Sequence, residues 1–316
     1  MFKNKISLVM AALLILCISI YMFTFTGKNL DFVLPRRGYK IWAMILISCA
    51  IAYSSVVFQT ISSNRILTPS IMGFDSFYLL IQSVLVYIYG DKTFQVLSSS
   101  SNFALSVGLM LLFSIIMYIF VFKKETKSIY ILLLVGLLLG TLFRSISSFI
   151  AILLDPNEFL VVQASMFASF ENIKINLLGI ATVVLIGAMF LGFRYFRPLD
   201  VVNLGRENAI SLGVNYNKLV RNNLMLISVM VAVSTALVGP ITFLGLLVAN
   251  LSYELFKSIK HSHLIFGCCL LTSVVIIGGQ YLVEHLFNMS TTISIIINFV
   301  GGIYFIYILL KSNKKS

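Results

Sequence analysis

Residues 175–193 read INLLGIATVVLIGAMFLGF, a run without a charged side chain and with a single amide, Asn176. An α-helix rises about 1.5 Å per residue, so about 20 such residues cross the roughly 30 Å hydrocarbon core of a bilayer. Backbone polar groups find no water there, and a helix satisfies them internally. The run therefore predicts a membrane-spanning helix, and similar runs recur along the chain.

The composition agrees with a chain that lies mostly in lipid. Of the 316 residues, 59% are hydrophobic and 11% are charged, which is more apolar surface than a water-soluble core hides. The net charge of +12 would suggest nucleic acid as the partner of a soluble protein, but the basic residues lie in short segments between apolar runs. That placement reports membrane orientation, so we expect a lipid bilayer and no nucleic acid as the partner.

The length of a bilayer-spanning helix divides the chain into about ten apolar segments. They lie near residues 6–25, 41–59, 71–89, 103–122, 129–154, 175–193, 219–238, 241–256, 264–283 and 293–310. The third and eighth contain or adjoin Gly73, Asp75, Gly239, Pro240 and Gly245, so we expect these two helices to be short or broken. The sequence predicts an all-α, polytopic transmembrane bundle that forms a single domain over residues 1–316.

The distribution of positive charge orients these spans. With the N-terminus inside, the cytoplasmic loops receive most of the 23 Lys and Arg residues, among them Arg65, Lys257 and the basic group within 194–221. An even number of spans with both termini in the cytoplasm follows. The first segment follows Lys3 and Lys5 and lacks a small-residue cleavage site, so we expect a retained span rather than a signal peptide.

Two longer polar stretches interrupt the spans, near 155–174 and 194–218. Neither is long enough for a soluble domain. The outer stretch, 155–174, mixes Phe159, Leu160 and Phe167 with polar residues. This pattern fits either a helix on the membrane surface or a plain connection.

The chain lacks the motifs of an enzyme or of a transporter that hydrolyses its own nucleotide. The phosphate-binding pattern G-x-x-x-x-G-K-[ST] does not occur, so any nucleotide must bind to another subunit. No hydrolase signature is present either. The cysteines and histidines lack the spacing of a metal site or disulfide framework: Cys17, Cys49, Cys268, Cys269, His261, His263 and His285. We predict no catalytic residue, no metal ligand and no cofactor bound by this chain.

One polar segment between two spans is the most informative part of the sequence. Residues 199–214 read LDVVNLGRENAISLGV, and Gly205 and Gly213 are expected to bound short helices. An ordinary helical loop shares these features. The residue order, however, resembles the L-D-x-x-x-L-G-x-x-x-A-x-x-L-G-V segment of the iron-siderophore and cobalamin permease family of ABC importers, the FecCD type.

Two further blocks resemble the same family in the same order. Pro35-Arg36, Gln59 and the run NRILTPSIMG at 64–73 are similar to its P-R, Q and N-P-L-A-x-P-x-x-x-G block. The run GPITFLGL at 239–246 is similar to its G-P-I-x-F-V-G-L motif. The resemblance covers about residues 33–310 and implies a permease of type II ABC importer architecture in the bacterial cytoplasmic membrane.

The chain also departs from the family pattern. ANLSY at 249–253 stands where P-H-x-x-R is common, Gln280 and Glu284 align with an Asp and an Arg, and GIYF at 302–305 replaces P-F-F. The residue order around Gln280–Glu284 and in the segment ending at 302–305 resembles that of a branch of the family that handles catecholate siderophores. Within the family, uptake of cobalamin or haem is the alternative.

Two other classes of membrane protein are also considered. A carrier driven by an ion gradient should show several intramembrane carboxylates, and Asp75 is nearly alone in the predicted spans. A membrane-embedded enzyme should show a cluster of catalytic side chains, which the sequence lacks. Both classes are therefore less favoured than the ABC permease.

The resemblance implies that segment 199–214 docks on a cytoplasmic ABC ATPase subunit, which binds ATP and Mg. The matching residues expected to make or shape this contact are Leu204, Gly205, Arg206, Glu207, Ala209, Leu212, Gly213 and Val214. Charged side chains on a short rigid helix make charge-assisted hydrogen bonds and transmit movement. A second permease chain, identical or paralogous, would complete the pore.

Three basic residues near the second span lie outside, against the positive-inside bias: Arg36, Arg37 and Lys40. The resemblance implies that Arg36 receives acidic residues of an extracytoplasmic siderophore-binding protein. Val33 occupies the place of the family's other Arg, so Arg37 or Lys40 is expected to substitute. Contact with lipid headgroups is the alternative role for the three.

Four polar residues fall inside predicted spans: Gln59, Asp75, Arg144 and Asn298. A charge at mid-bilayer costs at least about 2.5 kcal/mol, so these groups should face protein or water. These groups are expected either to hold helices together, with Asp75 and Arg144 pairing across helices, or to line the pathway of an anionic ferric chelate.

Overall fold

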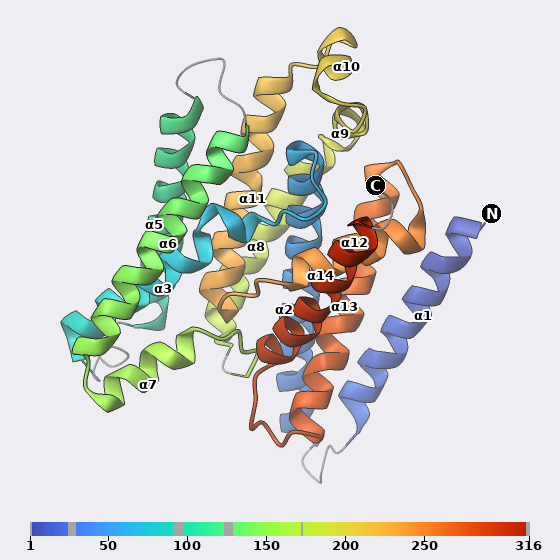
Figure 1. Cartoon of the computed structure of the whole chain (residues 1–316). Helices are drawn as coiled ribbons and strands as arrows, with labels where there is room; N and C mark the ends of the chain where they lie inside the picture. The colour runs from blue at the N-terminus through green and yellow to red at the C-terminus, as the bar shows by residue number, and fades with distance from the viewer. Residues whose placement is uncertain (1, 25–29, 91–97, 123–128, 172, 314–316) are drawn as a thin grey trace.

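The computed structural model describes residues 2–24, 30–90, 98–122, 129–171 and 173–313, and the regular structure in these ranges is helical (Figure 1). The helices are α1 Phe2–Phe23, α2 Leu30–Ser62, the 3-10 helix η1 Pro69–Met72, α3 Phe74–Tyr89, α5 Ser99–Phe122, α6 Ile129–Leu153, α7 Pro156–Ser165, α8 Ile175–Phe193, α9 Phe196–Val202, α10 Arg206–Ser211, α11 Tyr216–Val238, α12 Leu244–Phe256, α13 His261–His285 and α14 Ile293–Asn313.

The described part of the chain contains 7 helices that are long and apolar enough to cross a membrane, and α3, α12 and α14 are shorter apolar helices. Each predicted apolar segment coincides with one of these helices. α2 begins at Leu30, well before residue 41, so the basic residues 36–40 lie on the helix itself. The chain breaks at Gly73 before α3, and α12 has 13 residues, so both are short as predicted.

α2 is the central helix, since most of its apolar length is buried. Helices α8, α11, α12 and α13 pack around it. Close approach depends on small residues: a Cβ on Gly245 of α12 would collide with the Ser55 hydroxyl, and one on Gly192 of α8 would lie 2.7 Å from the Tyr53 ring. Lipid gives no hydrophobic force between helices, so such tight packing stabilises the bundle.

A second group of helices, α3, α5 and α6, packs around aromatic rings. The ring centroids of Phe77 and Phe113 are 4.8 Å apart, and Phe143 lies 4.9 Å from Phe77 and 5.3 Å from Phe113. Helix α11 contacts both α5 and α2. It therefore joins the second group to the central one.

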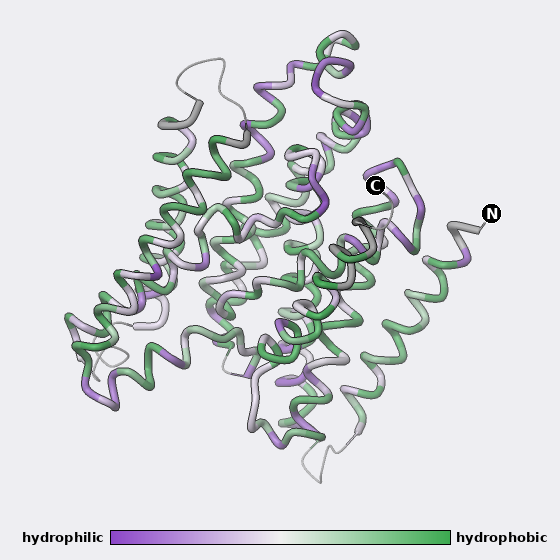
Figure 2. The backbone as a smooth tube through the Cα atoms, in the orientation of Figure 1, coloured by the Kyte–Doolittle hydropathy of each residue, from purple (hydrophilic) through white to green (hydrophobic). Residues whose placement is uncertain are grey.

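The two ends of the bundle differ. α9 and α10 lie at the end where α1 begins and α14 ends, and α7 lies at the opposite end (Figure 1). Figure 2 shows hydrophobic residues along the helices and hydrophilic ones gathered around α9 and α10 and at the turns. The outer stretch 155–174 thus contains a helix, α7, which begins with a capping box of Asp155 and Glu158.

Candidate functional site

A cavity of ≈ 720 Å³ lies where two segments that interrupt the helices meet α6 and α14. One is the stretch through η1 to Gly73, and the other is the stretch 239–243 between α11 and α12. The lining includes three of the four predicted intramembrane polar residues: Asp75, Arg144 and Asn298. Small-molecule sites occupy roughly 300–1,000 Å³, so this space suits a ligand much larger than an ion.

The polar residues of this cavity bear on both interpretations of their role. Within the described residues no ion pair joins Asp75 to Arg144, although both line the same space. Asn298 Oδ1 accepts a hydrogen bond from Thr242 Oγ1 at 3.0 Å. The second interpretation, lining of a pathway, agrees with their placement.

The two interrupting segments, one ending at Gly73 and the other spanning 239–243, are held in place by close backbone contacts. Gly73 has φ 85°, and a Cβ there would lie 3.0 Å from the Gly136 carbonyl oxygen and 3.2 Å from Gly140 Cα, both on α6. Gly239 has φ 97°, and a Cβ there would lie 3.0 Å from the Phe167 carbonyl oxygen. Only glycine combines a left-handed backbone with such proximity. Gly73 therefore forms part of the cavity wall, and Gly239 positions Pro240, which also lines it.

The loop after α2 is held through the carbonyl oxygen of Arg65. Gln59 Nε2 donates to it at 2.8 Å, and Asn250 Nδ2 donates at 2.9 Å. The guanidinium carbon of Arg65 lies 4.5 Å from the Tyr253 ring centroid. Asn250 and Tyr253 belong to the stretch that departs from the family pattern, and here they anchor this loop. Gln59, also predicted to face the pathway, does not line the cavity of ≈ 720 Å³.

The segment predicted to contact an ATPase forms the short helices α9 and α10. Gly205 caps the start of α10 with φ 102°, and Gly213 follows its end with φ 83°. The Gly213 N–H donates to the Ile210 carbonyl at 2.9 Å, and the Val214 N–H donates to the Ala209 carbonyl at 3.0 Å. This hydrogen-bond pair is the Schellman motif, which fixes the end of a helix. The two glycines bound α10 as predicted.

The solvent-exposed face of this segment carries both apolar and charged side chains. Leu204 and Leu212 are 56% and 64% exposed, whereas Ala209 is fully buried. Arg206 and Glu207 are exposed in the first turn of α10. We call the exposed set Leu204, Arg206, Glu207, Ile210 and Leu212 the coupling surface. Exposed apolar side chains rimmed by charges are typical of a protein-docking surface.

The coupling surface is tied to the spans through Asp200 on α9. Asp200 Oδ1 accepts a hydrogen bond from the backbone N–H of His261 at 2.6 Å and lies 2.7 Å from His261 Nδ1. His261 Nε2 lies 2.8 Å from Thr60 Oγ1, near the end of α2. Neither Asp200 nor His261 was among the individual residues predicted to act in this contact. The signal that was available is the Asp that follows the first Leu of the L-D-x-x-x-L-G motif.

At the opposite end, two of the three predicted docking cations have partners within the chain. Arg37 Nη1 donates to the carbonyl oxygens of Tyr21 and Thr24, each at 2.7 Å, and so holds the end of α1. Lys40 Nζ lies 3.0 Å from Glu284 Oε1. Within the described residues, Arg36 has no hydrogen bond or ion pair, and its side chain is exposed. Arg36 is therefore the free cation of the three.

Glu284 gathers several polar groups around itself. The Tyr21 hydroxyl donates to its Oε1 at 2.7 Å, and Gln280 Nε2 donates at 3.0 Å. With Lys40, these contacts join α1, α2 and α13. Gln280 and Glu284, which stand where the family often has an Asp and an Arg, thus belong to one polar cluster that joins these three helices. In the part of the chain that the structure describes, no group of three His, Cys, Asp or Glu side chains comes together as a metal site.

Comparison with known proteins gives consistent results. The model of the FecCD transport family matches residues 5–311. The petrobactin import system permease protein YclO of Bacillus subtilis (strain 168) is 49% identical over 313 residues, 99% of each chain. The petrobactin import system permease protein FatC of Bacillus anthracis is 33% identical over 279 residues, 88% of this chain and 79% of that protein. A solved metal-chelate type ABC transporter in an inward-facing conformation has the same fold, with a TM-score of 0.85, 20% identity and coverage of 98% of this chain and 99% of that one.

Proposed function

This chain belongs to the FecCD transport family, and from that membership we propose that it is the membrane-spanning permease of an ABC importer for a ferric siderophore of catecholate type. ATP and Mg bind to a separate ATPase subunit, and this chain supplies the path through the membrane. The relatives at 49% and 33% identity, both petrobactin import permeases, support a siderophore over cobalamin or haem.

The observation that carries this proposal is that contacts within the chain connect the coupling surface to the helices around the cavity. A cavity of ≈ 720 Å³ lies within the spans, and the coupling surface lies outside them at one end. The Asp200–His261 contact connects that surface to α13, and Thr60 extends the connection to α2. A movement imposed on α9 and α10 would therefore reach the helices that pack around the path.

Under this proposal, each end of the bundle faces a defined side of the membrane. The end with α9 and α10 faces the cytoplasm and its ATPase, so both termini are cytoplasmic. The opposite end carries the exposed Arg36, which receives acidic residues of an extracytoplasmic siderophore-binding protein. A second permease chain, identical or paralogous, completes the pore in the bacterial plasma membrane.

The proposal is tested by uptake and by copurification. Cells that lack this gene should lose uptake of radiolabelled ferric petrobactin or a related catecholate and regain it with the wild-type gene. The tagged chain should bring down an ABC ATPase. A ferric hydroxamate, haem and cobalamin serve as comparison substrates.

Two results would contradict the proposal. Uptake that survives an inactive ATPase but stops when ion gradients collapse would identify a gradient-driven carrier. Loss of haem or cobalamin uptake with intact siderophore uptake would identify a different substrate within the same family.

A further inference from the structure

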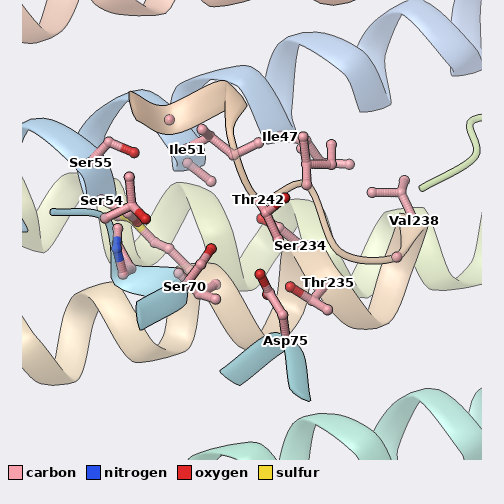
Figure 3. A pocket seen from close by; sticks show the side chains of 18 residues that line it. Ile47, Ile51, Ser54, Ser55, Ser70, Asp75, Ser234, Thr235, Val238 and Thr242 are labelled. Carbon is pink, nitrogen blue, oxygen red and sulfur yellow. The ribbon is translucent and has the colours of Figure 1, made fainter. Parts of the chain in front are cut away.

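A second, smaller cavity of ≈ 40 Å³ lies between α2, α11 and the two segments that interrupt the helices (Figure 3). Its wall includes Thr68, Ser70, Asp75 and Thr242, which also line the large cavity. A site must offer at least about 10–15 Å³ to hold one water molecule. The small cavity therefore accommodates water or a single ion and excludes a chelate.

The polar side chains of this cavity offer only oxygen atoms. They are Ser54, Ser55, Thr68, Ser70, Asp75, Ser234, Thr235 and Thr242. No Lys, Arg, His, Asn or Gln lines the cavity, so its walls carry one carboxylate and no positive charge. Hard cations prefer such oxygen ligands, whereas the Met230 sulfur that also lines the cavity is a soft atom that they do not select.

Two of these oxygen atoms are buried without a partner. Asp75 Oδ2 and Ser234 Oγ have no hydrogen bond within the described residues, and Asp75 and Ser234 are only 7% and 6% exposed. Figure 3 shows the Asp75 carboxylate directed toward Ser70, Ser234 and Thr242. The Asp75 carboxylate has a side-chain hydrogen bond with Ser70, but its buried Oδ2 lacks a partner, and a cation in this space would supply one.

The positive charge of Arg144 attracts Asp75 only from beyond ion-pair distance. Arg144 lines the large cavity but not the small one, and it forms no ion pair with Asp75. Asp75 lies in the first turn of α3, whose positive dipole end favours the ionised carboxylate but does not complete its hydrogen bonds. Asp75 Oδ2, which lacks a hydrogen-bond partner, therefore faces a cavity of ion size.

We propose that the small cavity binds one monovalent cation of the Na⁺ class, with Asp75 as the charged ligand and Ser234 as a hydroxyl ligand. A single carboxylate among hydroxyl groups balances one positive charge, whereas Ca²⁺ sites combine six to eight oxygen ligands with several carboxylates. Because Asp75 also lines the large cavity, the bound cation neutralises a negative charge on its wall. If the proposed function holds, this neutralisation eases the passage of an anionic chelate.

The test uses the full-length chain, purified in detergent, and needs no siderophore. Thermal unfolding is measured at constant ionic strength in NaCl, KCl, LiCl and choline chloride. Binding of one ion well above its Kd should raise the unfolding midpoint in NaCl over that in choline chloride by about 2–4 °C. Direct binding of ²²Na⁺ should saturate at one ion per chain.

Variants locate the site. Asp75→Asn keeps the shape of the side chain and should abolish both the NaCl-dependent shift and ²²Na⁺ binding, whatever its own stability. Ser234→Ala should weaken ²²Na⁺ binding by about tenfold, as expected for a lost ligand. Ser252→Ala, which removes a fully buried hydroxyl of α12 outside both cavities, should bind ²²Na⁺ as the wild type does.

Three outcomes would overturn the proposal. Equal midpoints in all four salts with no ²²Na⁺ bound would show that the cavity holds only water. Binding that Asp75→Asn retains would place the ion elsewhere. Equal weakening by Ser234→Ala and Ser252→Ala would remove Ser234 from the ligand set. Because the assay uses this chain alone, failure of the siderophore proposal would leave it unaffected.

Discussion

Replacing Asp200 by Ala should uncouple transport from ATP hydrolysis, so that less chelate is taken up for each ATP hydrolysed. The substitution removes the oxygen that accepts from the His261 backbone N–H at 2.6 Å and contacts His261 Nδ1 at 2.7 Å. A hydrogen bond to a charged group contributes roughly 1.5–3 kcal/mol. Both contacts end on one oxygen and are not additive, so we take this range for the pair. It corresponds to a shift of about 10-fold to 150-fold toward α9 detached from α13.

The assay is the ratio of chelate uptake to ATP hydrolysis by the purified complex in proteoliposomes. Asp200→Ala should lower that ratio about tenfold or more, while the ATPase subunit remains bound and active. Asp200→Asn should lie between, because its amide oxygen can still accept from the His261 backbone N–H. Asn203→Ala, an exposed neighbour on the same loop, is the matched control and should keep the wild-type ratio.

An unchanged ratio in Asp200→Ala would refute the reasoning, since the contact would then carry no force. An equal fall in Asn203→Ala would show that the loop is generally sensitive to substitution. Unfolding midpoints of all variants are measured in parallel. A large fall in midpoint for Asp200→Ala alone, with normal coupling in the surviving protein, would assign the contact to stability.

Three further changes test other parts of the structure. Gly73→Ala should lower the free energy of unfolding by about 1–3 kcal/mol, because the residue has φ 85° and a Cβ there would lie 3.0 Å from a backbone oxygen of α6; thermal unfolding measures it, and an unchanged midpoint would exclude the close contact. Arg36→Glu should slow association with the binding protein about tenfold at low salt, and Arg37→Ala should instead lower the unfolding midpoint; surface-immobilised binding kinetics distinguish the two, and equal association rates would leave Arg36 with a lipid role. Glu284→Ala should destabilise the chain by about 3–5 kcal/mol, because Lys40 loses its partner, and the double variant with Lys40→Ala should recover part of this loss; no recovery would argue against the ion pair.

The spans follow from the sequence because lipid imposes a simple requirement on each segment separately. A run such as 175–193 must satisfy its own backbone hydrogen bonds, and α8 covers the same residues. The short α3 and α12 were also predictable, because glycine and proline mark where a helix cannot continue. The start of α2 at Leu30 was missed because basic residues interrupt the hydropathy, although they do not interrupt the helix.

The candidate site was predictable only where a local pattern encodes it. Gly205 and Gly213 bound α10 because left-handed backbone positions favour glycine, and the sequence shows both. Asp75, Arg144 and Asn298 were identified as costly polar groups in lipid, but nothing local showed that they line one cavity.

The sequence by itself thus determined which segments cross the membrane and which loop carries a partner-binding pattern. Only the tertiary structure decided the partners of the polar side chains. It gave Lys40 to Glu284 and His261 to Asp200, and it left Arg36 free. The physical reason is range: burial and helix ends are decided by neighbouring residues, whereas a hydrogen bond between distant residues depends on how whole helices pack.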